Sequence, residues 1–439
     1  MVPALPGTAS GGIVRAMIRG RRHARPGRPT SSLAALAALA IVLVGVLPSP
    51  ARAASGLLAT ADLAPRAGQP EEGSATTAMR DRLDRRLDAL SERFGYPGIS
   101  AAIRFRDGSV WVGTDGLADT ATKTPVTADT AFAIASISKT FTAALILALV
   151  QDGELYLDSP VGSILSDLPP DANIDPDATI RQLLDHTSGL NDYFFHPAID
   201  AALLREPERR WELADALRYV GTPYFEPGQG WHYSNTNYLI LGAVAEEVGE
   251  APLAEQLRTR FFEPLGLHAT WYQPDEEPIA PVSVGYRFAG TGAEAPAISL
   301  ADGTTTMPFS SVVTAAAAAG GVASSAADLV RWARALYGGD VLEPLTVEAM
   351  LDDVARTAVY APGVPYGLGV QRTVIDGYDA IGHSGRLLGY RSVVRWLPGP
   401  DVTVAVLSNQ SREDPGNVAR VLLRTAIGPT DPCDCAERR

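Results

Sequence analysis

Hydrophobic and polar positions become regular at residues 79–94, where leucines recur at helical spacing opposite charged side chains. This pattern predicts an amphipathic helix. The runs ISAAIRF and SVWVG follow, joined across Asp107-Gly108, and they predict a β-hairpin. The run SISKTFTAALILALVQDG, which begins at residue 136, is apolar on nearly all sides, and we expect it to form a buried helix.

The rest of the chain divides into a helical segment and a segment of strands. Residues 151–295 have the pattern of short helices broken by Pro and Gly. Four strand-like runs lie within residues 366–410, and a helical pattern covers 416–427. Short turns between strands favour antiparallel pairing. We therefore expect an α+β fold in which residues 79–150 and 296–428 build the sheet and residues 151–295 form a mostly helical insertion.

The first 53 residues have a different composition. They carry seven arginines and no acidic residue, and the basic part is followed by an apolar run at 33–47 and by the small-residue sequence PSPARA. These three parts predict a signal peptide cleaved near Ala53, with Met17 as an alternative start. An apolar run of about fifteen residues is short for a membrane span. We therefore expect a secreted protein without a stable membrane anchor.

Two further segments are expected to lie outside the folded domain, which we place at residues 79–428. Residues 54–78 are rich in Ala, Gly, Pro and Glu, a composition that predicts a flexible linker. Residues 429–439 are expected to form a tail. The two cysteines of the chain, Cys433 and Cys435, both lie in this tail, so no disulfide is expected to cross-link the core.

The charge of the chain argues against one class of partner and draws attention to one residue. The formal net charge is −13 at pH 7, and removal of the first 53 residues would make it −20. A strongly acidic protein is a poor ligand for nucleic acid. Of the 37 basic residues only two are lysines, and one of them, Lys139, stands in the apolar run that begins at residue 136.

Lys139 and Ser136 lie three residues apart, which puts an amine and a hydroxyl on one face of a helix. An alcohol becomes a good nucleophile when a neighbouring base takes its proton. Lysine can be that base when burial keeps it neutral, whereas arginine stays charged. The pair is therefore a candidate for nucleophilic catalysis, and taken alone it is a weak signal. The alternative is a lysine that forms a structural ion pair or extends its amine to the surface.

Two later motifs supply groups suited to the same chemistry. Tyr233 and Asn235 stand just before an apolar helix, and His383, Ser384 and Gly385 stand at the end of a predicted strand. A tyrosine can relay a proton, an asparagine can orient an amine or a substrate amide, and a glycine lets a substrate approach a strand edge. Taken singly, these residues also fit a helix cap, a strand-end histidine and a turn.

Together and in this order, the motifs resemble those of the penicillin-recognising serine hydrolases, in the branch that contains class C β-lactamases, serine D-alanyl-D-alanine carboxypeptidases and related esterases. The sequences LLDHTSGL, PGQGWHYSNTNYLILGAV and YGLGV are similar to sequences of this branch. The resemblance covers about residues 85–425. It implies a β-lactamase/transpeptidase-like fold, in which helices flank an antiparallel sheet and the site lies in the crevice beside the helical part.

The resemblance also implies roles for individual residues. Ser136 is the nucleophile that forms an acyl-enzyme, and Lys139 is the amine next to it. Tyr233 stands where the family has a general base that later protonates the leaving group, and Asn235 completes that motif and binds substrate. The backbone N–H groups of Ser136 and Arg386 are expected to form the oxyanion hole.

The implied substrate-binding residues depart in part from the family pattern. His383 stands where many β-lactamases have lysine, and Ser384 and Gly385 fill the next motif positions. Gln371 stands where carboxypeptidases often have an arginine that binds the substrate carboxylate, and Arg372 is its neighbour. Adjacent residues of a strand face opposite ways. Whether Arg372 reaches the substrate is therefore open on the sequence alone.

The implied activity is that of an exported serine hydrolase, and a D-alanyl-D-alanine carboxypeptidase that acts on peptidoglycan peptides is the first hypothesis. A β-lactamase or small-ester hydrolase is one alternative, and a penicillin-binding or penicillin-sensing protein without turnover is another. We expect no cofactor and no metal, because the histidines lack metalloprotease spacing, and the chain has no Gly-x-Ser-x-Gly motif. His186, in the sequence DHTSG, is expected to have a structural role in a turn.

Overall fold

The computed structural model describes residues 76–428, apart from 170–171, 289–295 and 359–364, and the side chains of 353–356. The predicted signal peptide, nearly all of the predicted linker and the tail with its two cysteines lie outside the described residues. No helix among the described residues is long and apolar enough to cross a membrane. Nor do these residues contain a group of three or more His, Cys, Asp or Glu that could hold a metal ion.

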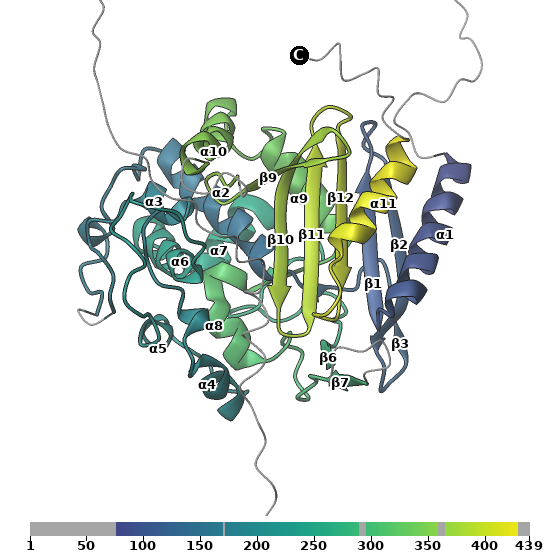
Figure 1. Cartoon of the computed structure of the whole chain (residues 1–439), viewed down its shortest axis with the longest axis horizontal. Coiled ribbons are helices and arrows are strands. Elements are labelled where there is room, and N and C mark those ends of the chain that lie inside the picture. Colours follow the sequence, from purple (N-terminus) through teal and green to yellow (C-terminus); the bar gives the residue numbers. More distant parts are fainter. Residues whose placement is uncertain (1–75, 170–171, 289–295, 359–364, 429–439) are drawn as a thin grey trace, which may run out of the picture. The chain divides into compact units, whose positions relative to one another are not determined.

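A seven-stranded antiparallel sheet forms one side of the domain (Figure 1). Its central strands are buried along nearly their whole length, because helices cover both faces. In spatial order the strands are β3 (Thr124–Pro125), β2 (Val110–Asp119), β1 (Gly98–Arg104), β12 (Val402–Ser408), β11 (Tyr390–Leu397), β10 (Tyr378–Leu387) and β9 (Gln371–Ile375).

Three helices cover the two faces of this sheet. The terminal helices α1 (Thr77–Phe94) and α11 (Gly416–Ile427) pack on one face, where their leucines meet the valines of β12 in a separate hydrophobic cluster. Helix α9 (Ala326–Tyr337) packs on the other face, in the larger core cluster. The amphipathic helix, the hairpin and the antiparallel strands predicted from the sequence are therefore confirmed.

One predicted strand is shorter than the sequence pattern indicated. The run YGLGVQRTVI enters the sheet only at Gln371, where β9 begins. The residues before it form a turn in which Gly367 N–H donates to Val370 O, and Gly369 has a positive φ of 79°. Glycine adopts this left-handed conformation without steric strain, whereas extended pairing would require a negative φ.

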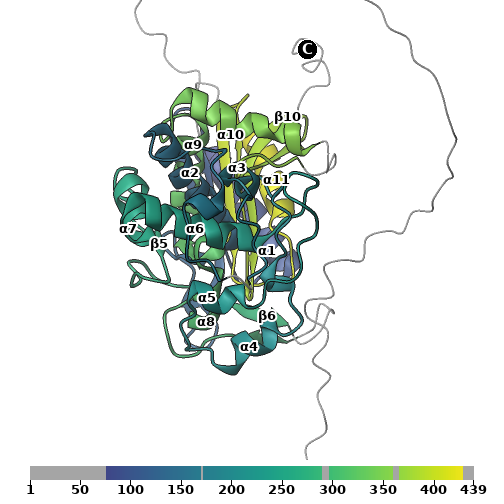
Figure 2. The same cartoon turned by 90° about the vertical axis from the view of Figure 1, so that its left-hand side faces the viewer.

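A layer of helices lies beside the end of the sheet formed by β10 and β9, and Figure 2 shows this layer facing the viewer. Helix α2 lies inside it, and twelve of its fourteen residues are buried, as its all-round apolar pattern predicted. The layer contains α2 (Ser138–Gln151), η3 (Val161–Ser163), α3 (Ile180–Leu184), η4 (Tyr193–Phe195), α4 (Ile199–Arg205), α5 (Leu213–Leu217), α6 (Asn235–Gly249), α7 (Leu253–Leu257), the π-helical turn η5 (Arg258–Phe262), α8 (Ser310–Gly320) and α10 (Pro344–Thr357).

Two small sheets connect these parts. The first has the order β4 (Phe132–Ala133), β8 (Val322–Ser324) and β5 (Trp271–Tyr272), and the second pairs β6 (Tyr286–Phe288) with β7 (Ala297–Ser299). Strand β4 leads directly into the turn that carries Ser136. The small three-stranded sheet therefore fixes the position of that turn.

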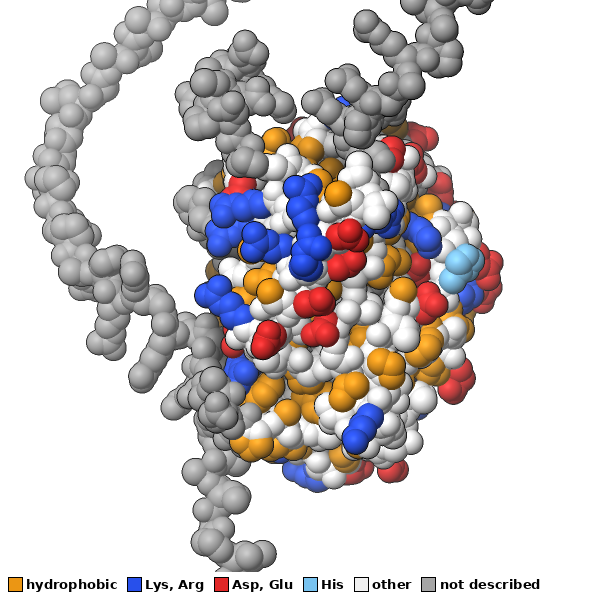
Figure 3. Space-filling model, turned by 90° about the vertical axis from the view of Figure 1, so that its right-hand side faces the viewer, with side chains coloured by type: hydrophobic (Ala, Val, Ile, Leu, Met, Phe, Trp, Pro, Cys, Tyr) orange, Lys and Arg blue, Asp and Glu red, His pale blue; other side chains and the backbone are white. Residues whose placement is uncertain are grey.

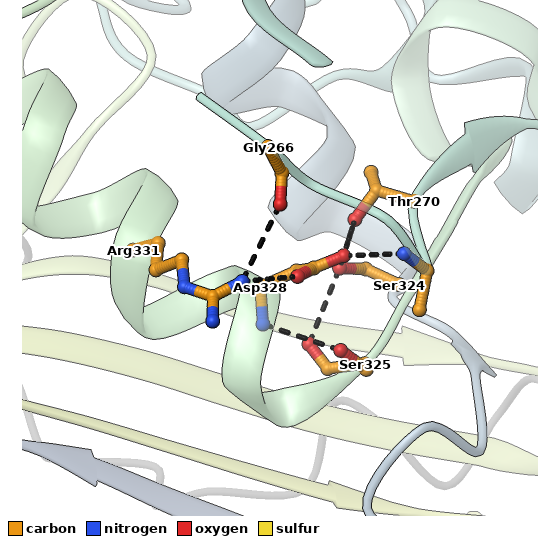
Figure 4. A network of polar contacts seen from close by, with 7 residues as sticks. Gly266, Thr270, Ser324, Ser325, Asp328 and Arg331 are labelled. Carbon is orange, nitrogen blue, oxygen red and sulfur yellow. Dashed lines mark hydrogen bonds and ion pairs between the residues drawn. The ribbon is translucent and has the colours of Figure 1, made fainter. Parts of the chain in front are cut away.

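A buried carboxylate stabilises the outer end of this small sheet (Figure 4). Asp328 accepts hydrogen bonds from Ala269 N at 2.7 Å and from the Thr270 hydroxyl at 2.9 Å, and Arg331 lies 3.3 Å from its other oxygen. Ser325 caps α9 by accepting from Asp328 N–H at 3.2 Å. Burial raises the pKa of Asp328, and the hydrogen bonds oppose that shift.

The surface on the side of α1 and α11 carries charges of both signs (Figure 3). Figure 3 shows basic side chains gathered in the upper part of this face with acidic side chains beside and below them. Arg424 of α11 forms an ion pair with Asp376 at the surface of the domain. Interspersed charges of this kind are typical of a solvated surface.

Candidate active site

Ser136 lies in a strained turn between β4 and α2. The turn is the 3₁₀ segment η2 (Ala135–Ile137), and its first residue, Ala135, has a φ of 53°. A non-glycine residue in this conformation is strained and persists only where the surroundings hold it. Ser138 provides one such contact, because its hydroxyl accepts a hydrogen bond from Val322 N–H of β8 at 3.0 Å. The turn is thus fixed to the small sheet on one side and continues into a buried helix on the other.

The Lys139 amine lies next to the Ser136 hydroxyl and is completely buried. Its Nζ atom is 3.3 Å from Ser136 Oγ, 2.7 Å from Asn235 Oδ1 and 2.7 Å from the backbone oxygen of Ala319. Ala319 lies near the end of α8, beyond a kink at Ala317. The helical spacing of serine and lysine predicted this contact. The carbonyl from α8 had no signal in the sequence.

The two short hydrogen bonds of Lys139 Nζ determine the direction of the third position on this nitrogen. The Ala319 oxygen and Asn235 Oδ1 can only accept hydrogen bonds, so each must take an N–H of the amine. In a neutral amine the remaining position is a lone pair, and it faces Ser136 Oγ. The geometry can therefore accept the serine proton once the lysine has lost its charge.

Asp192 fixes the orientation of Asn235. This carboxylate is buried, and its two oxygens accept from Asn235 Nδ2 at 2.9 Å and from Phe194 N–H at 3.1 Å. Because Nδ2 donates to Asp192, Oδ1 is the atom that faces Lys139. The Lys139 amine, the Asn235 amide and the Asp192 carboxylate are therefore linked by hydrogen bonds. These bonds run across the cleft from α2 to the loop before η4.

The charge states of Lys139 and Asp192 are linked. Burial lowers the pKa of Lys139 to about 7, and the nearby Asp192 charge opposes that shift. Burial also raises the pKa of Asp192 to about 6, against the hydrogen bonds from Phe194 and Asn235 and the charge of Lys139. Neutral lysine is thus available near neutral pH, which an exposed lysine does not offer.

Tyr233 lies beside the same amine. Lys139 Nζ is 5.1 Å from the centre of the phenol ring. Burial raises the pKa of Tyr233 well above its usual value, and a hydrogen-bonding contribution from the Ser136 hydroxyl lowers it only in part. The phenol oxygen is buried, and no group in the described part of the chain forms a well-aligned hydrogen bond with it. Tyr233 is therefore a protonated phenol close to the serine, suited to donate a proton.

His383 is close to this group but points its ring nitrogens elsewhere. Nδ1 lies 2.6 Å from the Ser384 carbonyl oxygen, so Nδ1 carries the proton, and Nε2 accepts from the Tyr366 hydroxyl at 3.0 Å. Burial lowers the pKa of His383 to about 3, with the Lys139 charge acting in the same direction. A neutral His383 therefore supports the cleft wall and supplies no positive charge to a substrate.

Gly385 lets strand β10 pack against the serine turn. A Cβ atom here would lie 2.2 Å from the Ile134 oxygen and 3.0 Å from the Ala135 Cβ. The Ser392 hydroxyl, on the neighbouring strand, donates to the same Ile134 oxygen at 2.7 Å. A side chain at Gly385 would therefore push the strand away from the turn that carries the serine.

The edge of β10 next to this turn is open. Within the described residues β9 pairs with β10 only as far as Gly382. Beyond that point Ser384 N–H points away from β11, because it donates to Gln371 Oε1 at 3.1 Å. N–H groups two residues apart on a strand point the same way, so Arg386 N–H also faces the open edge. This position suits the second oxyanion donor expected from the sequence.

The structure separates Arg372 from this group. Its guanidinium forms an exposed ion pair with Asp379, at 3.1 Å. Gln371 occupies the site side of the edge instead: its Oε1 accepts from Ser384 N–H, from the Ser384 hydroxyl at 3.2 Å, and from Arg395 Nη2 at 2.7 Å. The structure therefore brings Ser136, Lys139, Tyr233, Asn235, Ser384 and Gly385 together and leaves Arg372 on the surface.

His186 has the structural position expected for it. It occupies a turn with a φ of 66°, and its Nδ1 accepts from Ser234 N–H at 3.2 Å and from Asn237 Nδ2 at 2.9 Å. Burial keeps its pKa well below the usual value. It therefore holds the start of α6, and with it Tyr233 and Asn235, in place.

Comparison with known proteins places the chain among hydrolases. A family model described as Beta-lactamase matches residues 83–427. Penicillin-binding protein 4 of Amycolatopsis lactamdurans is 31% identical over 338 residues, covering 74% of this chain and 84% of that protein. A D-aminopeptidase of Cereibacter sphaeroides is 27% identical over 362 residues, covering 80% of this chain. That match covers 64% of the aminopeptidase, so this chain spans less than two thirds of its length.

Solved structures agree with this assignment. A D-stereospecific amidohydrolase from Streptomyces sp. superposes with a TM-score of 0.66 at 27% identity, and the match covers 82% of this chain and 100% of that chain. The family model spans most of the described domain, so the resemblance and the α+β fold predicted from the sequence are both confirmed. The chain belongs to the β-lactamase family and is a serine hydrolase of that family.

Proposed function

We propose that the protein hydrolyses amide bonds next to D-amino acid residues through an acyl-enzyme on Ser136, as a D-alanyl-D-alanine carboxypeptidase. The observation that carries the mechanism is the Lys139 amine, buried 3.3 Å from Ser136 Oγ with its other two contacts made to acceptors. The similarity to a penicillin-binding protein supports the substrate class.

The proposed reaction is described by the order of its proton transfers. Neutral Lys139 takes the proton of the Ser136 hydroxyl as Oγ attacks the scissile carbonyl. The N–H groups of Ser136 and Arg386 stabilise the oxyanion, and loss of one such donor typically lowers kcat about 10²–10³-fold. The leaving amine takes a proton from Tyr233, which regains one from Lys139. Water then releases the acid and restores the serine.

This order assigns the first proton transfer to lysine and not to tyrosine. A base works best when its pKa lies near the working pH. Burial lowers the pKa of Lys139 to about 7 but raises the pKa of Tyr233 far above the neutral range. The phenolate is thus the less accessible base, and the protonated phenol is the better acid.

A second candidate is removal of an N-terminal or amide-blocked D-residue. It is favoured by the relatives named D-aminopeptidase and D-amino acid amidase, the latter matching at a TM-score of 0.65 and 26% identity. The engagement of Arg372 by Asp379 also removes the nearest sequence candidate for a carboxylate-binding arginine. β-Lactam or ester turnover, and penicillin binding without turnover, use the same serine.

The test is a substrate panel combined with mapping of the adduct. Fluorescent penicillin should label Ser136 in the mature protein, and Ser136→Ala should remove the label. Release of D-alanine from diacetyl-Lys-D-Ala-D-Ala should accompany it. Hydrolysis of D-alanine amide or of nitrocefin without that release would reject the carboxypeptidase assignment in favour of the amidase or β-lactamase. An acyl adduct that never turns over would indicate a sensor.

Export is part of the proposal. The basic and apolar parts of residues 1–53 support it, with cleavage near Ala53. Peptidoglycan peptides would then be in the same compartment as the enzyme. Expression of the full chain in a bacterial host, followed by sequencing of the N-terminus of protein from the medium, should give a start near residue 54. A full-length product that stays inside the cell would reject export.

A further inference from the structure

Three donors converge on one oxygen beside the proposed oxyanion position. Gln371 Oε1 accepts from Ser384 N–H at 3.1 Å, from the Ser384 hydroxyl at 3.2 Å and from Arg395 Nη2 at 2.7 Å. A carboxamide oxygen rarely needs three donors, one of them a guanidinium. A carboxylate oxygen accepts such a set readily, because charge-assisted bonds are the strongest ones.

The guanidinium in this group is a buried charge without a neutralising partner. Arg395 is 8% exposed, and its described hydrogen bonds go to the carbonyl oxygens of Val394 and Gln371. No carboxylate in the described residues forms an ion pair with it, although Asp414 acts on it at longer range. Buried charges are normally paired, because desolvation of a lone charge is costly. The pocket thus has the charge and the donors of an anion site.

The position of this pocket fits a substrate bound along the open edge of β10. Ser384 N–H lies two residues from Arg386 N–H on the same edge, which is about 7 Å along a strand. A carboxylate on the residue after the scissile amide would lie within one residue of Ser384 on an extended substrate. Gln371 is the first residue of β9, at the edge of the sheet, and its partly buried side chain can leave the pocket without disturbing the core.

We propose that Gln371 is a specificity-determining residue whose side-chain oxygen fills an anion pocket built by Arg395 and Ser384, so that it competes with the carboxylate of the substrate. The inference deepens the proposed hydrolysis of D-alanyl peptides and rests on it. The wild-type enzyme then discriminates only weakly for a free carboxylate. Emptying the pocket by Gln371→Ala raises the preference for a free carboxylate. A permanent carboxylate at position 371 reverses that preference, because it repels the carboxylate of the substrate.

The test compares acetyl-D-Ala-D-Ala with its C-terminal amide, which has the same scissile bond and no charge. Gln371→Ala should raise the acid-to-amide ratio of kcat/KM by about tenfold, mainly through KM, because one charge-assisted hydrogen bond is worth that much. Gln371→Glu should lower the ratio by at least about tenfold. Thr373→Ala, an exposed change on the same strand, is the matched control and should leave the ratio unchanged. Ratios within about twofold of wild type in both Gln371 variants would overturn the proposal.

Two readouts keep this result separate from failure of the proposed function. If the wild type cleaves the D-Ala–D-Ala bond of neither peptide, releasing neither D-alanine from the acid nor D-alanine amide from the amide, the peptidase assignment fails. The same ratio is then measured with acetyl-D-Ala-D-lactate and its methyl ester. The melting temperature provides a test without turnover. Gln371→Glu should melt above both the wild type and Gln371→Ala, because the carboxylate neutralises Arg395. A melting temperature at or below that of the wild type would show that the pocket is no anion site.

Discussion

Replacing Asp192 by Asn should move the acidic limb of the rate profile to lower pH. The change keeps the shape of the side chain and an oxygen that can accept from Asn235, but it removes the charge. Lys139 must be neutral to take the serine proton, so activity is present above its pKa and is lost below it. Because the Asp192 charge raises the pKa of Lys139, its removal should lower that pKa and extend activity toward acid.

The structure sets the size of the shift. Two hydrogen bonds of 2.7 and 2.9 Å link Lys139 Nζ to Asn235 and Asn235 to Asp192. With the two bonds of the amide between them, the charges are at most about 8 Å apart. At an effective dielectric of about 20, the attraction is about 2 kcal/mol, or about 1.5 pH units. The pKa is about 7 for Lys139 and about 6 for Asp192, so the acidic limb of the wild-type profile should fall near neutral pH.

Other titratable groups near the Lys139 amine do not contribute to the acidic limb of the rate profile. His186, His383 and Tyr233 also face Lys139 within the described residues, but burial keeps both histidines neutral and the phenol protonated at neutral pH. The assay is kcat/KM from pH 5 to 9 on an uncharged ester substrate, with each profile normalised to its own plateau. The substrate then contributes no titration of its own.

Asp328→Asn is the matched control, because it also replaces a buried, hydrogen-bonded carboxylate, in the network drawn in Figure 4. It should lower the stability by about 1–3 kcal/mol and leave the pH midpoint in place. A midpoint for Asp192→Asn that stays within about 0.3 units of wild type, or rises, would refute the charge relation between the carboxylate and the amine.

Three further predictions follow from the geometry of the cleft. Lys139→Arg should lower acylation by at least about 10²-fold, because the guanidinium cannot take a proton, and a fluorescent penicillin adduct forming on Ser136 at the normal rate would contradict this. Gly385→Ala should lower kcat/KM by about 10²-fold, since the added Cβ would meet a backbone oxygen at 2.2 Å and displace the strand; a steady-state assay with normal kinetics would show that the edge is not tightly packed. Arg372→Ala should change the stability by less than about 1 kcal/mol and kcat/KM for acid and amide peptides equally, because its ion pair is exposed, and a selective loss on the acid would return Arg372 to the substrate site.

The elements of the fold that carry a regular pattern could be predicted from the sequence. Helix α1, the β1–β2 hairpin, the buried α2 and strands β10 to β12 all follow the expected periodicity. The start of β9 could not be predicted, because the strand-like pattern of YGLGVQRTVI runs from residue 366 into β9 without interruption. In the structure a left-handed turn at Gly369 precedes the strand. Periodicity detects which face is buried, and it does not detect where a chain leaves a sheet.

The candidate site could be predicted to the extent that it is local. Ser136 and Lys139 meet because three residues make one helical turn. Asp192 joins them from a loop 53 positions further along the chain, in the ordinary sequence GLNDY, so only the tertiary structure reveals its contact with Asn235. The same holds for Arg395, which reads as one more arginine on a strand until its pocket is seen.

The cleft thus contains two buried basic side chains, Lys139 and Arg395, and burial affects their charge states differently. Burial lowers the pKa of Lys139 to about 7, so this residue can lose its proton near neutral pH. Burial lowers the pKa of Arg395 only to about 10, so the guanidinium stays charged at neutral pH. The first can therefore set the pH dependence of the rate, and the second can set the preference for substrate charge. If the two functions are separate, the acid-to-amide ratio of kcat/KM should stay constant from pH 6 to 9 while both rates fall together below about pH 7. A ratio that changes with the rate would mean that one charge controls both.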